Sequence, residues 1–288
     1  MSQLVNKRNL KFHYSPLRYP GGKTFLYSFF DQIFKLNGIQ NITYIEPFAG
    51  GAGAALTLLF LEKVEKIIIN DLDKAIFSFW KSAIFDSERF IEKILSIPVT
   101  IKEWRKQKEL YANKTSNEFD LGVATFFLNR TNISGIIEGG VIGGINQEGK
   151  WKIDARFKKE NLIKKISQLS HYRNRIAVTN KDGLAVVNDY IKMDNTFFYL
   201  DPPYFEKGAS LYLNHYKKND HKILADQLNQ NANSRWLLTY DNCEEIRSLY
   251  PNRRIIDFTL NHNAHRAKKG QELMILSDSI ICPNYIIP

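Results

Sequence analysis

The sequence predicts an α/β protein built on a mostly parallel sheet. Seven short runs rich in β-branched and aromatic residues have the length and composition of strands, and helical patterns separate most of them. The expected strands span residues 43–48, 66–70, 175–179, 196–200, 235–240, 254–260 and 272–277. Only a loop, residues 261–270, lies between the last two, so we expect the final pair to be antiparallel.

Helices are expected between the strands because apolar residues recur there at helical spacing. Those next to the sheet span residues 24–36, 54–62, 74–85, 183–191, 220–229 and 244–250. Between the second and third strands lie about a hundred residues with four more helices, at 87–95, 102–111, 118–129 and 160–172. A segment of this length is an insert rather than a loop. We therefore expect one domain formed by residues 1–85 and 175–288, with a helical domain inserted at 86–174.

Composition indicates a sizeable core and a polyanionic partner. The chain has 288 residues, of which 44% are hydrophobic. Its 40 Lys and Arg outnumber its 30 Asp and Glu, which gives a net charge of +10. Residues 100–175 hold fifteen basic and eight acidic residues, so most of the excess falls in or beside the insert. Solvated lysines paired with glutamates at helical spacing are the alternative explanation.

Cysteine usage and hydropathy exclude several classes of protein. Cys243 and Cys282 have no metal-ligand spacing, and no signal segment or membrane-length apolar run is present. We therefore expect a cytoplasmic location, with neither a metal nor a membrane as partner. His262 and His265 are spaced as metal ligands on a helix would be, but no acid or cysteine accompanies them. This pattern favours polar loop histidines.

The run Asp201-Pro202-Pro203-Tyr204, directly after the fourth expected strand, is the most informative motif. Two consecutive prolines lack backbone N–H groups, so they end the hydrogen bonding of the strand and leave the carbonyls of Asp201 and Pro202 free to accept. Acceptors beside an aromatic ring suit a planar amine. Asp-Pro and Pro-Pro also occur as plain turns and rigid connectors, so this motif alone does not decide the matter.

The first expected strand leads into a glycine-rich turn, Glu46-Pro47-Phe48-Ala49-Gly50-Gly51-Ala52-Gly53, which opens a helix. Glycines in such a turn let the backbone approach a ligand closely. A dinucleotide fingerprint would need a further glycine where Leu56 stands, which argues against a nicotinamide or flavin cofactor. The negative charge of Glu46 near a helix start suits an ammonium or sulfonium group better than a pyrophosphate.

Asp71 and Asp73 follow the second expected strand, where an acid commonly binds ribose hydroxyls. Either one would alternatively cap the next helix, and the two roles can be divided between them. Lys23 follows two glycines near the start of another helix. It is not part of a phosphate-binding loop, because Leu17 stands at the first glycine position and no strand precedes it. Lys23 would reach an anionic group or remain a solvated lysine.

Together these motifs resemble the signature set of Dam-like, α-ordered DNA adenine-N6 methyltransferases. The resemblance rests on four motifs in order: RYPGGK at 18–23, EPFAGG at 46–51, NDLD at 70–73 and DPPY at 201–204. It extends through residues 126–131, 134–135, 139–149 and 272–275, and so covers nearly the whole chain. The resemblance implies a seven-stranded Rossmann-like S-adenosylmethionine-dependent methyltransferase sheet with an antiparallel last strand. It also makes the helical insert the target-recognition domain.

The implied reaction is methylation of the N6 amine of a flipped adenine in double-stranded DNA, with S-adenosylmethionine as cofactor. Its purpose would be restriction–modification, with a companion restriction endonuclease as a further partner, or the marking of DNA. Asp201 and Pro202 would accept the amine protons, and Tyr204 would stack on the flipped base. The expected cofactor-binding residues are Tyr19, Lys23, Glu46, Phe48, Gly50, Gly51, Asp71, Asp182 and Asp201. The expected DNA contacts are Arg130, Asn132, Ser134, Lys150, Lys152 and Arg156.

Within this set the resemblance implies a division of labour. Lys23 would lie near the methionine carboxylate of the cofactor, Asp71 would hold the ribose hydroxyls, and Asp182 would accept a hydrogen bond from the cofactor adenine. Two alternatives remain open: a methyltransferase for another planar amine, such as cytosine N4, RNA adenine or protein glutamine, or a noncatalytic DNA-binding protein on this scaffold. The glycine-rich stretch 136–150 is either a loop ordered by a ligand or a plain linker. The sequence predicts no recognition site and no role for the apolar residues 280–288.

Overall fold

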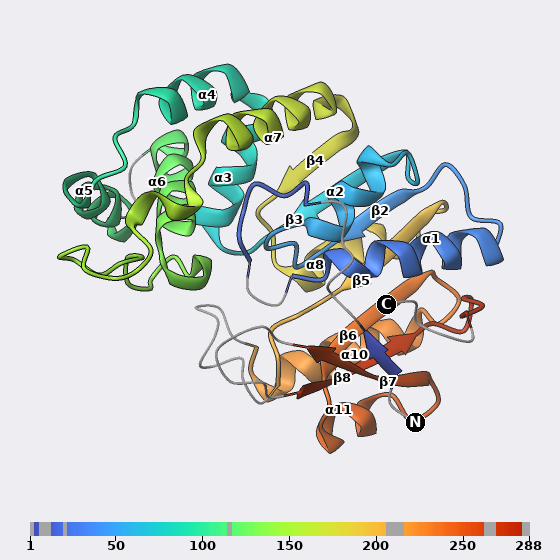
Figure 1. The fold of residues 1–288 in the computed structure, drawn as a ribbon. Helices are drawn as coiled ribbons and strands as arrows, with labels where there is room; N and C mark the ends of the chain where they lie inside the picture. The colour runs from blue at the N-terminus through green and yellow to red at the C-terminus, as the bar shows by residue number, and fades with distance from the viewer. Residues whose placement is uncertain are drawn as a thin grey trace. The chain divides into compact units, whose positions relative to one another are not determined.

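The computed structural model describes residues 3–5, 13–19, 22–113, 117–205, 216–261 and 269–283, which belong to two compact units (Figure 1). The first unit takes in residues 1–13, 23–72 and 181–288, and the second takes in 14–22 and 73–180. His262 and His265 lie outside the described residues. The expected boundaries of the functional domains, with an insert at 86–174, stay a prediction.

Seven strands of the first unit form a mixed sheet (Figure 1). In spatial order they are β1 (Gln3–Val5), β7 (Arg254–Asn261), β8 (Lys269–Leu276), β6 (Trp236–Asp241), β5 (Thr196–Leu200), β2 (Thr43–Glu46) and β3 (Lys66–Asn70). Only β8 runs antiparallel to its neighbours in this unit, β6 and β7. The remaining neighbours pair in parallel. The predicted α/β fold with an antiparallel last strand is confirmed.

One face of this sheet is covered by α1 (Tyr27–Leu36), together with the buried helix α2 (Gly53–Phe60). Phe30 of α1 contacts the rings of Tyr44 and Phe197, at centroid distances of 5.5 and 5.9 Å. Successive strand residues point to opposite faces, so the residues next to Tyr44 and Phe197 in sequence must pack on the other side. The strands are buried on both faces, which explains their nearly continuous apolar runs.

The opposite face carries three helices: α8 (Gly183–Tyr190), α10 (Lys218–Gln230) and α11 (Glu244–Leu249). Strand and helix residues form one buried cluster there, which includes Ile45, Phe198, Leu200, Leu238, Val186, Leu224 and Ile246. The first unit is therefore a three-layer sandwich of helices, sheet and helices. Because helices cover both faces of the sheet, a ligand can reach it at the ends of the strands.

The second unit is mainly helical. It contains α3 (Lys74–Phe85), α4 (Ser87–Ser96), α5 (Ile101–Ala112), α6 (Glu118–Thr131), α7 (Lys159–His171) and the short strand β4 (Ile176–Thr179). Helix α3 belongs to this unit because it packs closely on α6. Gly122 permits the approach: a Cβ atom there would lie 2.5 Å from the carbonyl oxygen of Ser78. The rings of Phe79 and Phe126 stack between the two helices at 5.6 Å.

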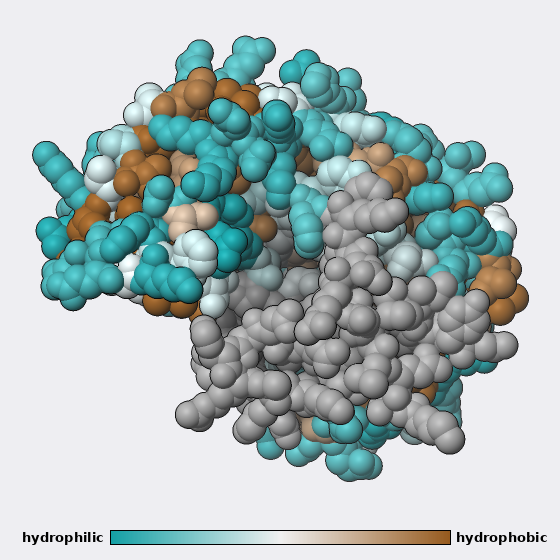
Figure 2. Space-filling view, viewed as in Figure 1, coloured by the Kyte–Doolittle hydropathy of each residue, from teal (hydrophilic) through white to brown (hydrophobic). Residues whose placement is uncertain are grey.

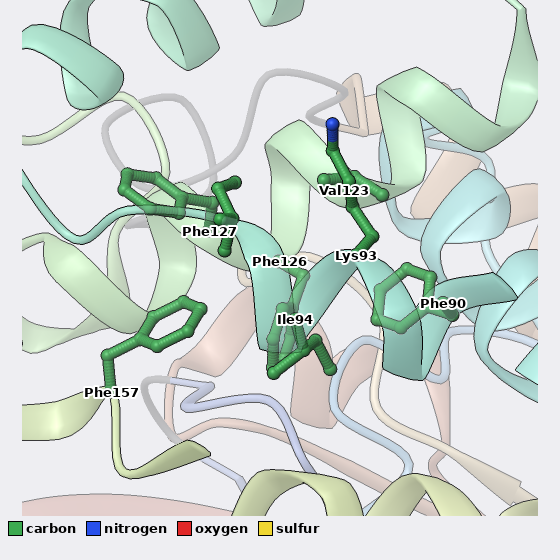
Figure 3. Close-up of a pocket in the computed structure, with 8 residues that line it drawn as sticks. Phe90, Lys93, Ile94, Val123, Phe126, Phe127 and Phe157 are labelled. Atoms are coloured by element: carbon green, nitrogen blue, oxygen red, sulfur yellow. The ribbon is translucent and has the colours of Figure 1, made fainter. Parts of the chain in front are cut away.

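Several phenylalanines pack at the centre of the second unit. Phe90, Phe126, Phe127 and Phe157 line a cavity of about 10 Å³ (Figure 3). A space of this size holds at most one water molecule, so it is not a cofactor site. In the described part of the chain, no helix is long and apolar enough to cross a membrane.

The expected strands and helices are present with small shifts at their ends, whereas one strand and four 3-10 helices of the described residues were not predicted. The three-residue strand β1 pairs in parallel with β7. A short 3-10 helix, Thr24–Leu26, precedes α1 where a single continuous helix was expected. Lys23 lies immediately before this 3-10 helix and is nearly completely buried.

We expect Gly122→Ala to destabilise the second unit. Its methyl group would meet the main chain of α3, and overpacking of this kind costs about 1–3 kcal/mol, more than alanine gains from helix propensity. Urea unfolding followed by circular dichroism measures the effect. Gly140→Ala is the matched control, because no atom lies within 4 Å of the added Cβ there. Equal stability of the two variants would contradict this explanation of how α3 and α6 pack.

Candidate functional site

Strands β2, β3 and β5 run in parallel, so the segments that follow them meet at one edge of the sheet. Asn70, the last residue of β3, joins the segment after β2 to the segment that leads into α8. Its amide nitrogen donates to the carbonyls of Pro47, at 2.8 Å, and Lys181, at 2.9 Å, while its oxygen accepts from the backbone N–H of Lys181 at 2.9 Å. The side chain is 1% exposed. Asn70 therefore holds the turn after β2 and the start of α8 against the end of β3.

The turn after β2 uses the left-handed backbone that glycine permits and is held by hydrogen bonds. Gly50 has a φ of 46°, in the left-handed region, and its N–H donates to the carboxylate of Asp71 at 2.9 Å. Gly50 and Gly51 are both buried. At the end of β2 the buried carboxyl group of Glu46 accepts from the N–H of Ala55, at 3.0 Å, in the first turn of α2. Burial raises the pKa of Glu46 to about 8, so this carboxyl group holds its proton near neutral pH.

The acids along this edge have distinct structural roles. Asp73 caps α3 by accepting from the N–H of Ala75 at 2.8 Å, which leaves Asp71 to bind the glycine turn. Asp73 thus takes the capping role, and the binding of ribose hydroxyls by Asp71 stays a prediction. Asp182 is exposed and caps α8 by accepting from the N–H of Leu184 at 2.8 Å. A carboxylate with one oxygen used in capping keeps further acceptor capacity for a ligand.

Phe48 extends from the glycine turn toward the start of α8. A Cβ atom at Gly183 would lie 2.4 Å from its ring, so only glycine permits this packing. On another side Phe48 meets the ring of Tyr216 edge-on, at 5.6 Å between centroids. Phe48 is half-buried, which leaves part of an aromatic surface close to Asp182.

Asp201 follows β5 and is held by residues of two other elements. Its Oδ1 accepts from the hydroxyl of Thr239 on β6, at 2.7 Å, and from Lys23 Nζ at 3.2 Å. Its Oδ2 accepts from Lys23 Nζ at 3.1 Å. Because the proton of Thr239 goes to the carboxylate, the hydroxyl of Tyr199 donates to Thr239 Oγ1, at 3.0 Å. The side chain of Asp201 is 24% exposed, so a ligand can reach it.

Lys23 links Asp201 to two further residues. Its Nζ donates to the hydroxyl of Tyr204 at 3.0 Å and lies 3.4 Å from Glu272 Oε2. The Tyr204 hydroxyl donates in turn to Glu272 Oε1 at 2.6 Å. We call Lys23, Asp201, Tyr204 and Glu272 the ion cluster. Lys23 and Glu272 are only 5% and 2% exposed, so the cluster is largely shielded from water.

Electrostatics explain why a buried lysine is tolerated in the ion cluster. Burial disfavours the ammonium, but the carboxylates of Asp201 and Glu272 outweigh it and raise the pKa of Lys23 well above its usual value. Burial also raises the pKa of Glu272, and Lys23 offsets part of that rise. Removing one partner from a buried ion pair typically costs about 3–5 kcal/mol. Lys23 therefore depends on the two acids for its charge.

The structure brings together many of the residues predicted from the sequence. Lys23, Asp201 and Tyr204 are in contact, and Pro202 is buried directly beside them in the chain. Tyr19 belongs to the second unit, where its carbonyl accepts from the N–H of Gly22 at 3.1 Å. The predicted ligand contacts of these residues stay predictions.

Sequence reasoning did not identify Thr239 or Glu272 as site residues. They lie 38 and 68 residues from the partners they bind, Asp201 and Tyr204, so no local spacing connects them. Glu272 opens a segment that carries the family resemblance, and a polar residue inside an apolar strand is the signal that could have identified it. Among the described residues, no group of three His, Cys, Asp or Glu could hold a metal ion.

The predicted DNA contacts all lie in the second unit, where they differ in exposure. Asn132 is fully buried: it accepts from the indole N–H of Trp104 at 2.7 Å and donates to two backbone carbonyls. This side chain orders the loop after α6, and its predicted DNA contact stays untested. Ser134, Lys150, Lys152 and Arg156 are exposed. Figure 2 shows a mostly hydrophilic surface over α4–α7, broken by apolar residues.

The second unit also gathers four cations, Arg18, Arg130, Arg156 and Lys165, which we call the cation cluster. Their described hydrogen bonds go to backbone carbonyls: Arg18 donates to Asn132 at 3.0 Å, Arg130 to Arg156 at 2.8 Å, and Lys165 to Ser15 at 2.8 Å. Burial and then the neighbouring arginines lower the pKa of Arg130 to about 10. Burial and then Arg130 lower the pKa of Lys165 to about 8. The positive charges of the cluster therefore lie close enough to repel one another.

We expect Glu46→Gln to change how stability depends on pH. In the wild type the carboxyl group keeps its proton in the folded state up to about pH 8 but loses it near its usual pKa of 4.5 when unfolded. Folding stability contributed by this group is therefore complete below pH 4.5 and lost as the pH rises to about 8. The variant, which keeps an acceptor for Ala55, should gain roughly 2–4 kcal/mol relative to wild type across this range.

Urea unfolding at a series of pH values tests this expectation. Glu245→Gln, at an exposed position of α11, is the control and should follow the wild-type curve. Parallel pH profiles of Glu46→Gln and wild type would mean that Glu46 is ionised in the folded protein.

Comparison with known proteins identifies the family of the chain. A family model described as D12 class N6 adenine-specific DNA methyltransferase matches residues 19–263. No curated protein is significantly similar to the chain. Among solved structures the chain is similar to the rRNA methyltransferase aviRa from Streptomyces viridochromogenes, with 10% identity, a TM-score of 0.33, and coverage of 91% of this chain and 87% of that chain. On the strength of the family match, which covers most of its length, the chain belongs to the D12 class N6 adenine-specific DNA methyltransferase family.

Proposed function

We propose that the protein transfers a methyl group from S-adenosylmethionine to the N6 amine of an adenine flipped out of double-stranded DNA. The observation that carries this proposal is the position of Asp201. Its carboxylate follows a buried strand, is held by Thr239 and Lys23, and remains partly open to a ligand. A fixed, accessible acceptor of this kind suits a planar amine.

The cofactor would bind at the edge where the segments after β2 and β3 meet. Glu46 supports this choice, because its buried carboxyl group has no cationic partner among the described residues and a nearby sulfonium would stabilise its ionised form. Phe48 offers an aromatic surface close to Asp182, which retains acceptor capacity for the cofactor adenine. The buried backbone of Gly50 and Gly51 would line the pocket. When bound, S-adenosylmethionine supplies an electrophilic methyl group.

Asp71 and Lys23 have additional proposed roles in cofactor binding. Asp71 accepts from the N–H of Gly50 and so lies against the glycine turn, where its carboxylate would also bind the ribose hydroxyls. The ammonium of Lys23 is directed at Asp201 and Glu272, so we favour a role for Lys23 in ordering the acceptor site over a direct contact with the methionine carboxylate. Tyr19 stays a proposed contact.

The amine would be activated by hydrogen bonding rather than by a strong base. The adenine amine is a weak nucleophile because its lone pair is delocalised into the ring. Asp201 and the carbonyl of Pro202 would each accept one amine proton, which moves the nitrogen toward tetrahedral geometry and directs its lone pair at the methyl group. The amine proton would leave after methyl transfer, when the nitrogen has become acidic.

A duplex buries the target amine, so the adenine must leave the helix and stack elsewhere. The ring of Tyr204 is the proposed stacking surface. Its hydroxyl is bound by both Lys23 and Glu272, so the ring is held in place before a base arrives. Preorganisation of this kind avoids the entropic cost of ordering the ring during binding.

DNA recognition is proposed for the helical second unit. Arg130, Ser134, Lys150, Lys152 and Arg156 are the proposed contacts, Asn132 would order the loop that carries Ser134 from within, and the cation cluster adds Arg18 and Lys165. Four cations without a carboxylate partner among the described residues form a natural site for phosphodiester groups. The proposed biological setting is restriction–modification or DNA marking.

We expect Asp201→Asn to reduce the kcat of methylation at least about 10²-fold. Asparagine has the same shape but presents only one acceptor oxygen and no charge, and losing such a group typically reduces kcat about 10²–10³-fold. The measurement is mass spectrometry of nucleosides from plasmid DNA incubated with protein and S-adenosylmethionine. N6-methyladenine should appear with wild type and with the exposed control Asp194→Ala. N4-methylcytosine, or label on protein alone, would refute the proposed substrate, and wild-type kcat in Asp201→Asn would refute the acceptor.

We expect Arg156→Gln to reduce the salt dependence of DNA binding. Removing one cation that pairs with a phosphate lowers the slope of log K against log salt by about 1. The side chain is exposed, and its backbone carbonyl still accepts from Arg130 in the variant. Lys81→Gln is the control, because Lys81 already pairs with Glu118 at 2.5 Å. Identical slopes for wild type and Arg156→Gln, measured by fluorescence anisotropy, would remove Arg156 from the proposed interface.

A further inference from the structure

The ion cluster contains one cation and two acids. Lys23 has three N–H donors, and Asp201, Tyr204 and Glu272 all lie within 3.4 Å of its nitrogen. Glu272 is bound on one side only: its Oε1 accepts from Tyr204, whereas its Oε2 accepts no hydrogen bond among the described residues. A buried carboxylate oxygen without a hydrogen bond is costly, so it calls for an explanation.

The substrate amine and Lys23 compete for Asp201. Oδ1 already accepts from Thr239 and Lys23, and Oδ2 accepts from Lys23. Oδ2 keeps one acceptor site, but the bond from Lys23 withdraws charge from it and so weakens it as an acceptor. The amine would therefore bind more strongly if Lys23 moved away from Oδ2.

Glu272 offers the lysine a nearby second position. Lys23 Nζ lies 3.4 Å from Glu272 Oε2, and a normal charge-assisted bond is about 2.8 Å long, so a movement of well under an ångström completes the contact. The ammonium would stay buried and paired throughout the movement. Without Glu272 the same movement would leave the buried ammonium of Lys23 without a carboxylate partner, which is energetically costly.

We propose that Glu272 is a positioning residue that draws Lys23 away from Asp201 when the adenine amine binds. This inference rests on the proposed function of Asp201 as the amine acceptor. In the empty site Lys23 neutralises Asp201, and in the substrate complex it moves to Glu272. After this exchange Asp201 Oδ2 no longer accepts from Lys23, so it accepts a stronger hydrogen bond from the substrate amine. The bond from Tyr204 to Glu272 would couple the same residue to the base-stacking ring.

Glu272→Gln tests the inference in the full-length protein. Glutamine keeps an oxygen that accepts from Tyr204 but loses the charge that attracts Lys23. We expect kcat for methylation of plasmid DNA to fall about 10- to 100-fold, as loss of one charge-assisted bond implies, while the Kd of S-adenosylmethionine changes less than about twofold. Glu245→Gln, at an exposed position of α11, should retain wild-type kcat.

A double-variant cycle separates this role from a merely structural one. Lys23→Met removes the competitor, so Glu272→Gln should lower kcat no further in that background, within about twofold. Losses that multiply in the double variant would overturn the inference, and so would wild-type kcat in Glu272→Gln alone. A wild-type protein that methylates no DNA would instead overturn the proposed function.

Discussion

The salt bridge from buried Lys23 to Asp201 and Glu272 is the interaction on which the site depends. A lysine excluded from water keeps its charge only if carboxylates surround it, and here the acids come from two separate strand regions of the first unit. The lysine in turn orients Asp201 and, through a shared hydrogen bond, the hydroxyl of Tyr204. The result is a partly exposed acceptor and an aromatic ring whose positions are determined before any ligand binds.

The sheet supplies the framework for this cluster. Parallel strands deliver their carboxyl ends to one edge, and Asn70 ties the neighbouring turns together with three hydrogen bonds. The acids near the ends of these strands have different structural roles, because each one binds a different neighbouring backbone group. Asp73 stabilises a helix, Asp71 stabilises the glycine turn, and Glu46 is buried at the helix start where its charge is suppressed.

Local patterns in the sequence predicted the helices and strands. The site residues that were not predicted act through contacts between positions far apart in the chain. Apolar runs predicted β2, β3, β5 and β6, because a sheet covered by helices on both faces requires apolar residues at successive positions. The strand β1 has only three residues, too few for a pattern. Thr239 and Glu272 were missed because each acts on a residue far away in the chain. Asn132 was predicted from the family resemblance, and a buried hydrogen-bonding role cannot be distinguished from a surface role by residue type alone.

A crystal structure of the protein with a cofactor analogue and a duplex containing its target adenine tests the central claim most directly. The account predicts that the flipped adenine lies against Tyr204, with its N6 within hydrogen-bonding distance of Asp201 Oδ2 and the Pro202 carbonyl. It also predicts that Lys23 lies closer to Glu272 than the present 3.4 Å. A base lodged away from residues 201–204, or a lysine still bound to both oxygens of Asp201 with the base in place, would contradict it.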